Sequence, residues 1–125
     1  MSDCLFCKIR DRDIPADIVF EDDDVLAFND VNPQAAVHVL IIPKKHIPTV
    51  NDIEAGDEAI MGKLFSVARR IAGHQGIGKD GYRMVVHCNE KAGQTVFHIN
   101  RHLLGGRTRT CSRESSFHIT KFVTL

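Results

Sequence analysis

The stretch FHINRHLLGG, residues 97–106, places His98 and His102 four positions apart with Asn100 halfway between them. Alternate side chains of an extended strand share a face, so these three point to one side and Arg101 points to the other. Two histidines on a strand are, taken alone, more often hydrogen-bonded surface groups than a functional site. The stretch therefore predicts a strand with a polar face, and its neighbourhood decides what that face does.

The loop before this strand supplies groups that suit an anion. It reads NEKAGQTVF and contains Gly93 and Gln94, a small residue and an amide. Backbone N–H groups can approach an anion closely in such a loop. Next to two imidazoles, this loop favours a binding site over an ordinary polar strand.

Short apolar runs elsewhere predict the other strands of a sheet. Two of them are separated by the acidic turn EDDD and have the spacing of a hairpin. The run VHVLIIP is too short and too β-branched for a helix and stops at a proline, so it predicts a well-buried strand. The predicted strands cover residues 18–20, 25–28, 37–43, 82–88 and 98–104.

Between about residues 55 and 76 the spacing of apolar residues changes from the alternation of a strand to the period of a helix, which predicts one amphipathic helix. Apolar residues from Ile60 to Ile71 recur there at spacings of three and four, and basic residues lie off that stripe. A helix of this kind covers one face of a sheet. The predicted architecture is a single α+β domain with a mostly antiparallel sheet and no internal repeat or linker.

Length and charge narrow the class of protein. The 125 residues fit one domain with a real core, and sixteen basic residues balance sixteen acidic ones. The chain therefore has no net positive charge that would attract nucleic acid or an anionic membrane. The N-terminus is charged where a signal peptide needs an apolar run, and no segment approaches the roughly 20 apolar residues of a membrane span. We expect a cytoplasmic protein whose partners include neither nucleic acid nor membrane.

Several longer motifs share one family resemblance, which runs from Cys4 to about residue 107. In chain order they are CLFCKI, IPADIVFEDD, LAFND, LIIPKKHI, GYRMVV, AGQTVFHI and HLLGGR. With these motifs the chain resembles the histidine-triad (HIT) nucleotide-binding proteins, specifically the Hint branch of purine nucleoside phosphoramidases. The resemblance implies a HIT domain over residues 1–107, built as a five-stranded antiparallel sheet with one main helix and a short N-terminal helix. It also implies a homodimer whose two sheets join into one of ten strands.

The resemblance further implies a purine nucleotide site that holds a nucleoside monophosphate or phosphoramidate. In the implied site, Asp30 is expected to accept hydrogen bonds from the ribose hydroxyls, His102 to bind a phosphate oxygen, and Thr95 to lie beside the leaving group. The resemblance also implies that His38 polarises its neighbours in the triad. The implied nucleotide-binding positions are Phe28, Asn29, Asp30, Val31, His87, Gly93, Gln94, Thr95, Asn100 and His102.

The implied reaction is hydrolysis of the P–N bond of a nucleoside 5′-phosphoramidate, or cleavage of an aminoacyl adenylate. In the family it needs no Mg²⁺ or other divalent cation, and the middle histidine of the triad attacks phosphorus to give a nucleotidyl-histidine. The catalytic positions are His38, His98, Asn100 and His102.

Asn100 stands at the middle position of the triad. An amide has no basic lone pair for phosphorus, although its NH₂ group can donate to a phosphate oxygen. His87 stands where similar proteins carry an asparagine, which leaves a displaced nucleophile open as an alternative. We therefore expect nucleotide binding with weak or absent turnover. The competing hypothesis is a non-catalytic dimer that binds nucleotides or partner proteins.

Two more departures from the family pattern follow. Arg101 takes an apolar position, where a guanidinium needs a carboxylate partner or a route to solvent. After residue 107 the resemblance stops, and the composition of residues 108–125 favours a mobile tail, with an extra strand over FHITKFVTL as the alternative.

Cysteine spacing admits a metal site. Four cysteines are too few for a disulfide scaffold, and Cys4-x-x-Cys7 in a reducing compartment suggests metal or redox chemistry. Some relatives of the triad superfamily bind zinc with such a pair and two histidines, which correspond here to His46 and His98. This would be a closed structural zinc site that fixes His98. The alternatives are two buried reduced thiols or, more remotely, a redox protein.

Overall fold

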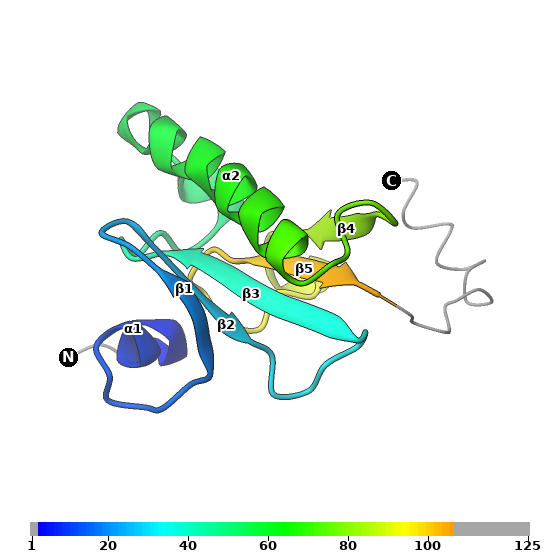
Figure 1. Cartoon of the computed structure of the whole chain (residues 1–125). Helices are drawn as coiled ribbons and strands as arrows, with labels where there is room; N and C mark the ends of the chain where they lie inside the picture. Colours follow the sequence, from blue (N-terminus) through cyan, green and yellow to red (C-terminus); the bar gives the residue numbers. More distant parts are fainter. Residues whose placement is uncertain (1–2, 107–125) are drawn as a thin grey trace.

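The computed structural model describes residues 3–106 (Figure 1). Two helices and five strands make up the domain, with three short 3₁₀ turns between them. In chain order they are α1 (Leu5–Arg10), β1 (Ile18–Glu21), β2 (Val25–Asn29), β3 (Val37–Pro43), η1 (Val50–Asp52), η2 (Ala55–Asp57), α2 (Glu58–His74), β4 (Tyr82–Val85), η3 (Glu90–Ala92) and β5 (Arg101–Gly105).

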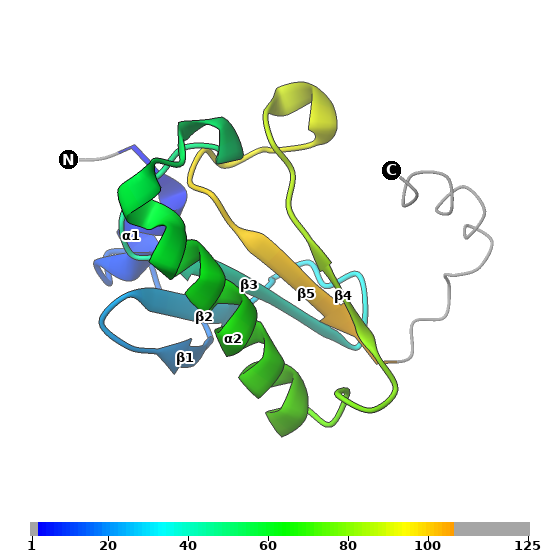
Figure 2. The same cartoon turned by 90° about the horizontal axis from the view of Figure 1, so that it is seen from above.

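The five strands form one antiparallel sheet in the order β1-β2-β3-β5-β4 (Figure 2). This confirms the predicted fold. The acidic turn closes the β1–β2 hairpin because the Asp22 carboxylate accepts from the backbone N–H groups of Asp24 and Val25, both at 2.9 Å. β3 has the predicted bounds and, lying between β2 and β5, it is buried from His38 to Pro43.

Two predicted strands are longer than the observed ones. The strand predicted over residues 98–104 begins only at Arg101, because the preceding segment leaves the sheet: the N–H of Ile99 donates to the carbonyl of Ile47 at 2.7 Å. The strand predicted over 82–88 ends at Val85, which pairs with His102. The pairing of β4 with β5 stops there, because β5 itself begins at Arg101, only one residue before His102.

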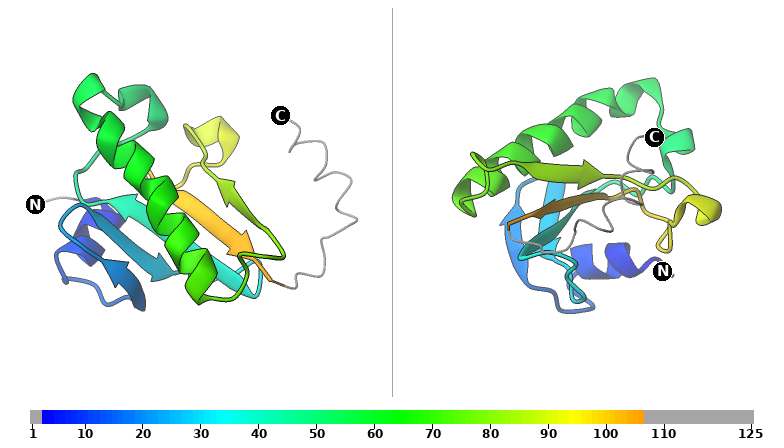
Figure 3. Two further views of the ribbon diagram at one scale, coloured as in Figure 1. Left: turned by 45° about the horizontal axis from the view of Figure 1, so that its top comes forward. Right: turned by 90° about the vertical axis from the view of Figure 1, so that its right-hand side faces the viewer.

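The two helices cover opposite faces of the sheet (Figure 3). The long helix is confirmed, but it begins at Glu58, because the 3₁₀ turn η2 occupies residues 55–57. Its apolar stripe, which includes Leu64, packs against Val39 and Leu103 in one core cluster. On the other face α1 packs Phe6 and Ile9 in a second cluster, against residues that include Leu26, Phe28, Leu40 and Ile42.

Within residues 3–106, no helix has the length and apolar character needed to cross a membrane. The expected domain end at residue 107 and the tail over residues 108–125 lie outside the described residues.

Candidate functional site

His98, Asn100 and His102 lie on the α1 side of the sheet, and the two histidines serve different clusters. The ring of His98 lies beside Cys4, Cys7 and His46, whereas the ring of His102 lies beside His38. Asn100 sits between the two clusters and lines the neighbouring cavity. The single polar face predicted from sequence is thus divided into two sites.

The cavity has a volume of about 670 Å³ and combines an apolar wall with a polar end. Its apolar wall comes largely from α1 and the sheet beneath it, through side chains such as Leu5, Phe6, Ile9, Phe28 and Leu40. All ten positions assigned to a nucleotide from sequence line this one cavity, including the 91% exposed Val31 at its rim. An enclosure with one apolar side and a few convergent polar groups is typical of small-molecule sites.

A chain of hydrogen bonds fixes the protons of two histidines at the polar end. His38 Nδ1 accepts from the backbone N–H of Gln34 at 3.0 Å, so neutral His38 carries its proton on Nε2. That Nε2–H donates to His102 Nδ1 at 2.9 Å, and Asp30 Oδ2 lies 3.4 Å from the same nitrogen. Neutral His102 must then carry its own proton on Nε2. His102 is therefore an N–H donor and not a base.

Burial keeps both imidazoles neutral. Burial, together with the nearby His38 and His87, lowers the pKa of His102 to about 4. The pKa of His38 is also lowered, chiefly by burial, against the opposing charge of Asp30. At pH 7 the two rings thus offer directed hydrogen bonds without a full positive charge.

Asp30, His38 and His102 bring possible metal-ligand atoms within 4.8 Å of one another. Their hydrogen bonds argue against a metal there. A metal would need a lone pair on His38 Nε2, yet Nδ1 of the same ring already accepts a backbone proton. This cluster is a chain of hydrogen bonds in which the position of each proton is fixed.

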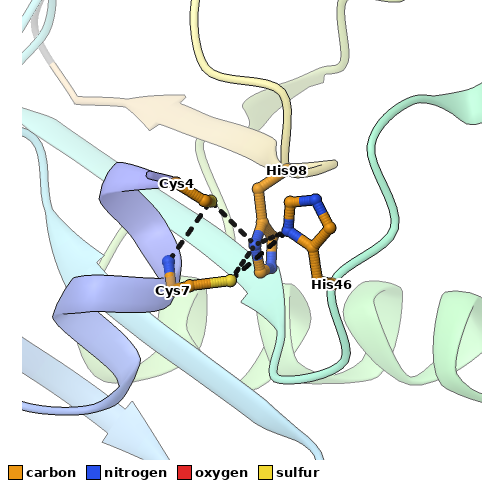
Figure 4. A group of neighbouring side chains, drawn as sticks. All are labelled: Cys4, Cys7, His46 and His98. Atoms are coloured by element: carbon orange, nitrogen blue, oxygen red, sulfur yellow. Dashed lines mark hydrogen bonds between the residues drawn. The ribbon is translucent and has the colours of Figure 1, made fainter. Parts of the chain in front are cut away.

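The second cluster has the geometry of a metal site (Figure 4). His98 Nδ1 lies 3.4 Å from Cys4 Sγ, 3.5 Å from Cys7 Sγ and 3.2 Å from His46 Nδ1, and His46 Nδ1 lies 3.3 Å from Cys7 Sγ. Tetrahedral Zn²⁺, with Zn–S of about 2.3 Å and Zn–N of about 2.1 Å, holds sulfur and nitrogen about 3.6 Å apart and two nitrogens about 3.4 Å apart. These four distances match this arrangement within a few tenths of an ångström, and all four donor atoms lie within 4.8 Å of one another.

The protonation of His98 also suits a metal. Its Nε2–H donates to the carbonyl of Pro43 at 2.8 Å, which leaves a lone pair on Nδ1 facing the two sulfurs. His98 is fully buried, and burial lowers its pKa to about 4. Burial raises the pKa of the Cys4 thiol, so a cation that binds its thiolate would displace a proton.

The loop before β5 holds its shape through Gln94. This buried side chain accepts from the N–H of Asn89 at 2.7 Å and donates to the carbonyls of Pro48 and Val96 at 2.8 and 3.1 Å. Gly93 precedes it with a φ of 106°, which an L side chain rarely adopts. The amide of Gln94 is thus used to build the polar end of the cavity.

One N–H of Asn100 is also used within the protein. Its Nδ2 donates to the carbonyl of His98 at 2.9 Å, which leaves the side-chain oxygen and the second N–H for other partners.

Comparison with known proteins places this fold and site. The HIT domain matches residues 11–109. The chain belongs to the HIT domain family. It is similar to purine nucleoside phosphoramidase of Escherichia coli K12, with 52% identity over 103 residues that cover 82% of this chain and 87% of the relative. An uncharacterised HIT-like protein of Synechocystis is 51% identical over 105 residues, covering 84% and 91% of the two chains.

Solved structures agree with these sequence relatives. A HIT family hydrolase from Legionella pneumophila matches with a TM-score of 0.84 and 48% identity, covering 88% of this chain and 98% of its own. One from Clostridium thermocellum matches with a TM-score of 0.85 and 43% identity, covering 91% and 98%. The chain is therefore related to phosphoramidases and hydrolases of the HIT family.

Sequence reasoning missed one polar and several apolar residues of this HIT cavity. Asp17 lines it and is held by the Asn29 side chain at 2.7 Å. Leu5, Phe6 and Ile9 form its α1 wall. The signal available for that wall was the spacing of three between Phe6 and Ile9 in CLFCKI.

Proposed function

We propose that this HIT protein binds a purine nucleoside 5′-monophosphate or phosphoramidate in the 670 Å³ cavity. The observation that carries the proposal is that all ten assigned positions, drawn from separate segments of the chain, line a single enclosure. An apolar wall suits a purine base, and the polar end beside His102 suits a phosphate.

The polar groups divide the work of recognition. Asp30 offers carboxylate oxygens to the ribose hydroxyls while its Oδ1 also accepts from the N–H of Asn32 at 2.8 Å. His102 donates its Nε2–H to a phosphate oxygen, in the orientation that His38 imposes. These groups are ordered by the protein before any ligand arrives, which lowers the entropy cost of binding.

We assign the chain to P–N bond hydrolysis with impaired catalysis. The likeness to a purine nucleoside phosphoramidase supports the reaction class. Asn100 stands at the position of the attacking histidine, and an amide cannot attack phosphorus. The alternative is a regulatory dimer that binds a nucleotide or a partner without turnover, and Asn100 is the residue that favours it.

We also propose that Cys4, Cys7, His46 and His98 hold a structural zinc ion. The four distances and the Nδ1 lone pair of His98 support this assignment. Zinc with four protein ligands has no open position, so it would join α1 to the segment before β5 and take no part in hydrolysis.

A homodimer completes the proposal. β4 ends the sheet, and two large apolar side chains are exposed: Val86, directly after β4, is 38% accessible and Phe65 of α2 is 53% accessible. An edge strand with apolar neighbours is a natural surface for a second copy.

Calorimetric titration with AMP tests the nucleotide assignment. We expect AMP to bind, and Asp30→Asn to weaken binding at least tenfold, because hydrogen bonds to a charged acceptor contribute about 1.5–3 kcal/mol. The matched control is Asp80→Asn, at an exposed carboxylate away from the cavity. No binding of AMP at millimolar concentration would end the nucleotide assignment.

A further inference from the structure

His87 differs from the other polar groups at the phosphate end of the cavity. Its half-buried ring lines the cavity with Asn100 and His102, and its centroid lies 5.5 Å from that of His102 at an interplanar angle of 67°. Within residues 3–106 the His87 ring makes this edge-on contact and no hydrogen bond.

The nitrogens of its neighbours are already assigned. His102 accepts from His38 on Nδ1 and must carry a proton on Nε2. Asn100 offers amide groups only, which are not basic. Among the described residues at this end of the cavity, His87 is the group that brings an imidazole lone pair with no internal partner.

Gly93 lies against this ring. A Cβ atom built on Gly93 would lie 3.4 Å from His87 Nδ1 and 3.7 Å from its Cε1, which is ordinary van der Waals contact. The loop that carries Gly93 is fixed in turn by Gln94. The half-buried His87 ring therefore packs beside a loop of fixed shape.

We propose that His87 is the general base for the residual hydrolysis of nucleoside phosphoramidates by this chain. The inference rests on the proposed function and adds a catalytic residue to it. A base needs to reach only the attacking water, whereas direct attack needs in-line placement within about 3.5 Å of phosphorus. His87 follows β4 and Asn100 precedes β5, and both line the cavity. In this proposal the attacking water lies between the His87 ring and the phosphorus.

The step balances as a single displacement. The water oxygen forms a bond to the α-phosphorus while His87 takes one of its protons. The P–N bond breaks, and the amine leaves with the electron pair of that bond and takes a proton from solvent. His87 then returns its proton to solvent, so one water is consumed and a nucleoside monophosphate and an amine are produced.

The test compares the unmodified chain with His87→Gln, using adenosine 5′-phosphoramidate as substrate and AMP binding as the second readout. We expect turnover to fall by about 10²–10⁴-fold, as is typical for loss of a general base, while the Kd for AMP changes less than about threefold. His74→Gln, at an exposed histidine of α2, is the matched control and leaves both values unchanged. Identical purification of all three proteins excludes a contaminating host enzyme as the source of turnover.

A chiral phosphorothioate version of the substrate, hydrolysed in water labelled with a heavy oxygen isotope, distinguishes the mechanism. Direct attack by water inverts the configuration at phosphorus, and a nucleotidyl-enzyme intermediate retains it. Retention, or a nucleotide trapped on His87 after acid quench, would overturn the general-base assignment. Equal turnover in the unmodified chain and in His87→Gln, including none in either, would overturn it as well. Failure of AMP to bind the unmodified chain would instead refute the proposed function.

Discussion

The guanidinium carbon of Arg101 lies 4.0 Å from the ring centre of Phe65, on the α2 face of the sheet. The sequence indicated that this charge needed a carboxylate or a route to solvent, and the structure gives it an aromatic ring. Its Nε is buried with no hydrogen-bond partner within the described residues, and burial lowers the pKa of the guanidinium. A cation–π contact of about 0.5–2 kcal/mol has to offset an unsatisfied N–H that costs about 1–3 kcal/mol.

Arg101→Leu should therefore stabilise the protein. We expect the free energy of unfolding to rise by about 1 kcal/mol or more, because the change removes an unsatisfied buried donor and adds apolar contact. Urea unfolding measures this change in the free energy of unfolding. Arg69→Leu, on the exposed side of α2, is the control and should stay within about 0.5 kcal/mol of the parent protein. A loss of stability in Arg101→Leu would show that the stacking on Phe65 outweighs the unpaired Nε.

Metal content is a direct prediction from the Cys/His cluster. Purified protein should contain about one zinc per chain, as closed structural sites do. Cys7→Ser should lose the metal and lower the melting temperature, whereas Cys88→Ser should retain it, because Cys88 lies outside the cluster. Metal analysis with no zinc, and thiols of Cys4 and Cys7 that titrate freely in the native protein, would contradict the assignment.

Asn100→His should restore fast hydrolysis. The variant regains the attacking imidazole, whose loss typically costs on the order of 10⁴ to 10⁶ in rate, and AMP affinity should stay within about tenfold. Turnover of adenosine phosphoramidate and calorimetric binding of AMP measure the two effects. The control, Asn51→His, places a histidine on the exposed turn η1 and should change neither. Substantial turnover in the unmodified chain, with a nucleotide trapped on His87 or His102, would show that the nucleophile has moved.

Light scattering tests the proposed assembly. At micromolar concentration the particle mass should equal two chains, and Val86→Lys should shift it toward one, since a charge beside the β4 edge opposes pairing. Val50→Lys is the control at a similarly exposed valine on η1. A monomer in the unmodified protein would refute the dimer.

Stability should depend on pH through His102. Its pKa is about 4 in the folded chain against an ordinary value of 6.5, so between these values the unfolded chain binds more protons. The free energy of unfolding should be full above pH 6.5 and should fall as the pH drops toward 4, by on the order of 2–3 kcal/mol. Urea unfolding at pH 7.5 and pH 5 measures the fall. His102→Gln should show a smaller fall, and an unchanged fall would mean that other groups carry it.

The sheet could be predicted because its signals are local. The run over β3 is apolar, β-branched and closed by a proline, and its predicted bounds match the structure. The start of β5 could not be predicted in this way. His98 and Asn100 continue the alternation of the strand, but a contact to Ile47 and the cluster around His98 draw the segment out of the sheet. Contacts distant in sequence overrode the local pattern there.

In the candidate site, too, features with local sequence signals could be predicted and features that depend on distant contacts could not. Motifs identified the ten cavity positions, since each lies within or directly beside a short stretch of characteristic sequence. The protons on His38 and His102 could not be read from sequence, because they depend on a backbone N–H of Gln34 and on a ring 64 positions away. The free lone pair of His87 depends equally on what its neighbours in space are bonded to.

The short helix α1 has a part in both sites. Cys4 caps this helix and Cys7 lies within it, while Leu5, Phe6 and Ile9 wall the cavity. The helix cannot detach from the sheet without dispersing the four donor atoms and opening the cavity in the same event. Its backbone amides should thus exchange with deuterium through one local opening, and a ligand at either site should slow that exchange for the whole helix.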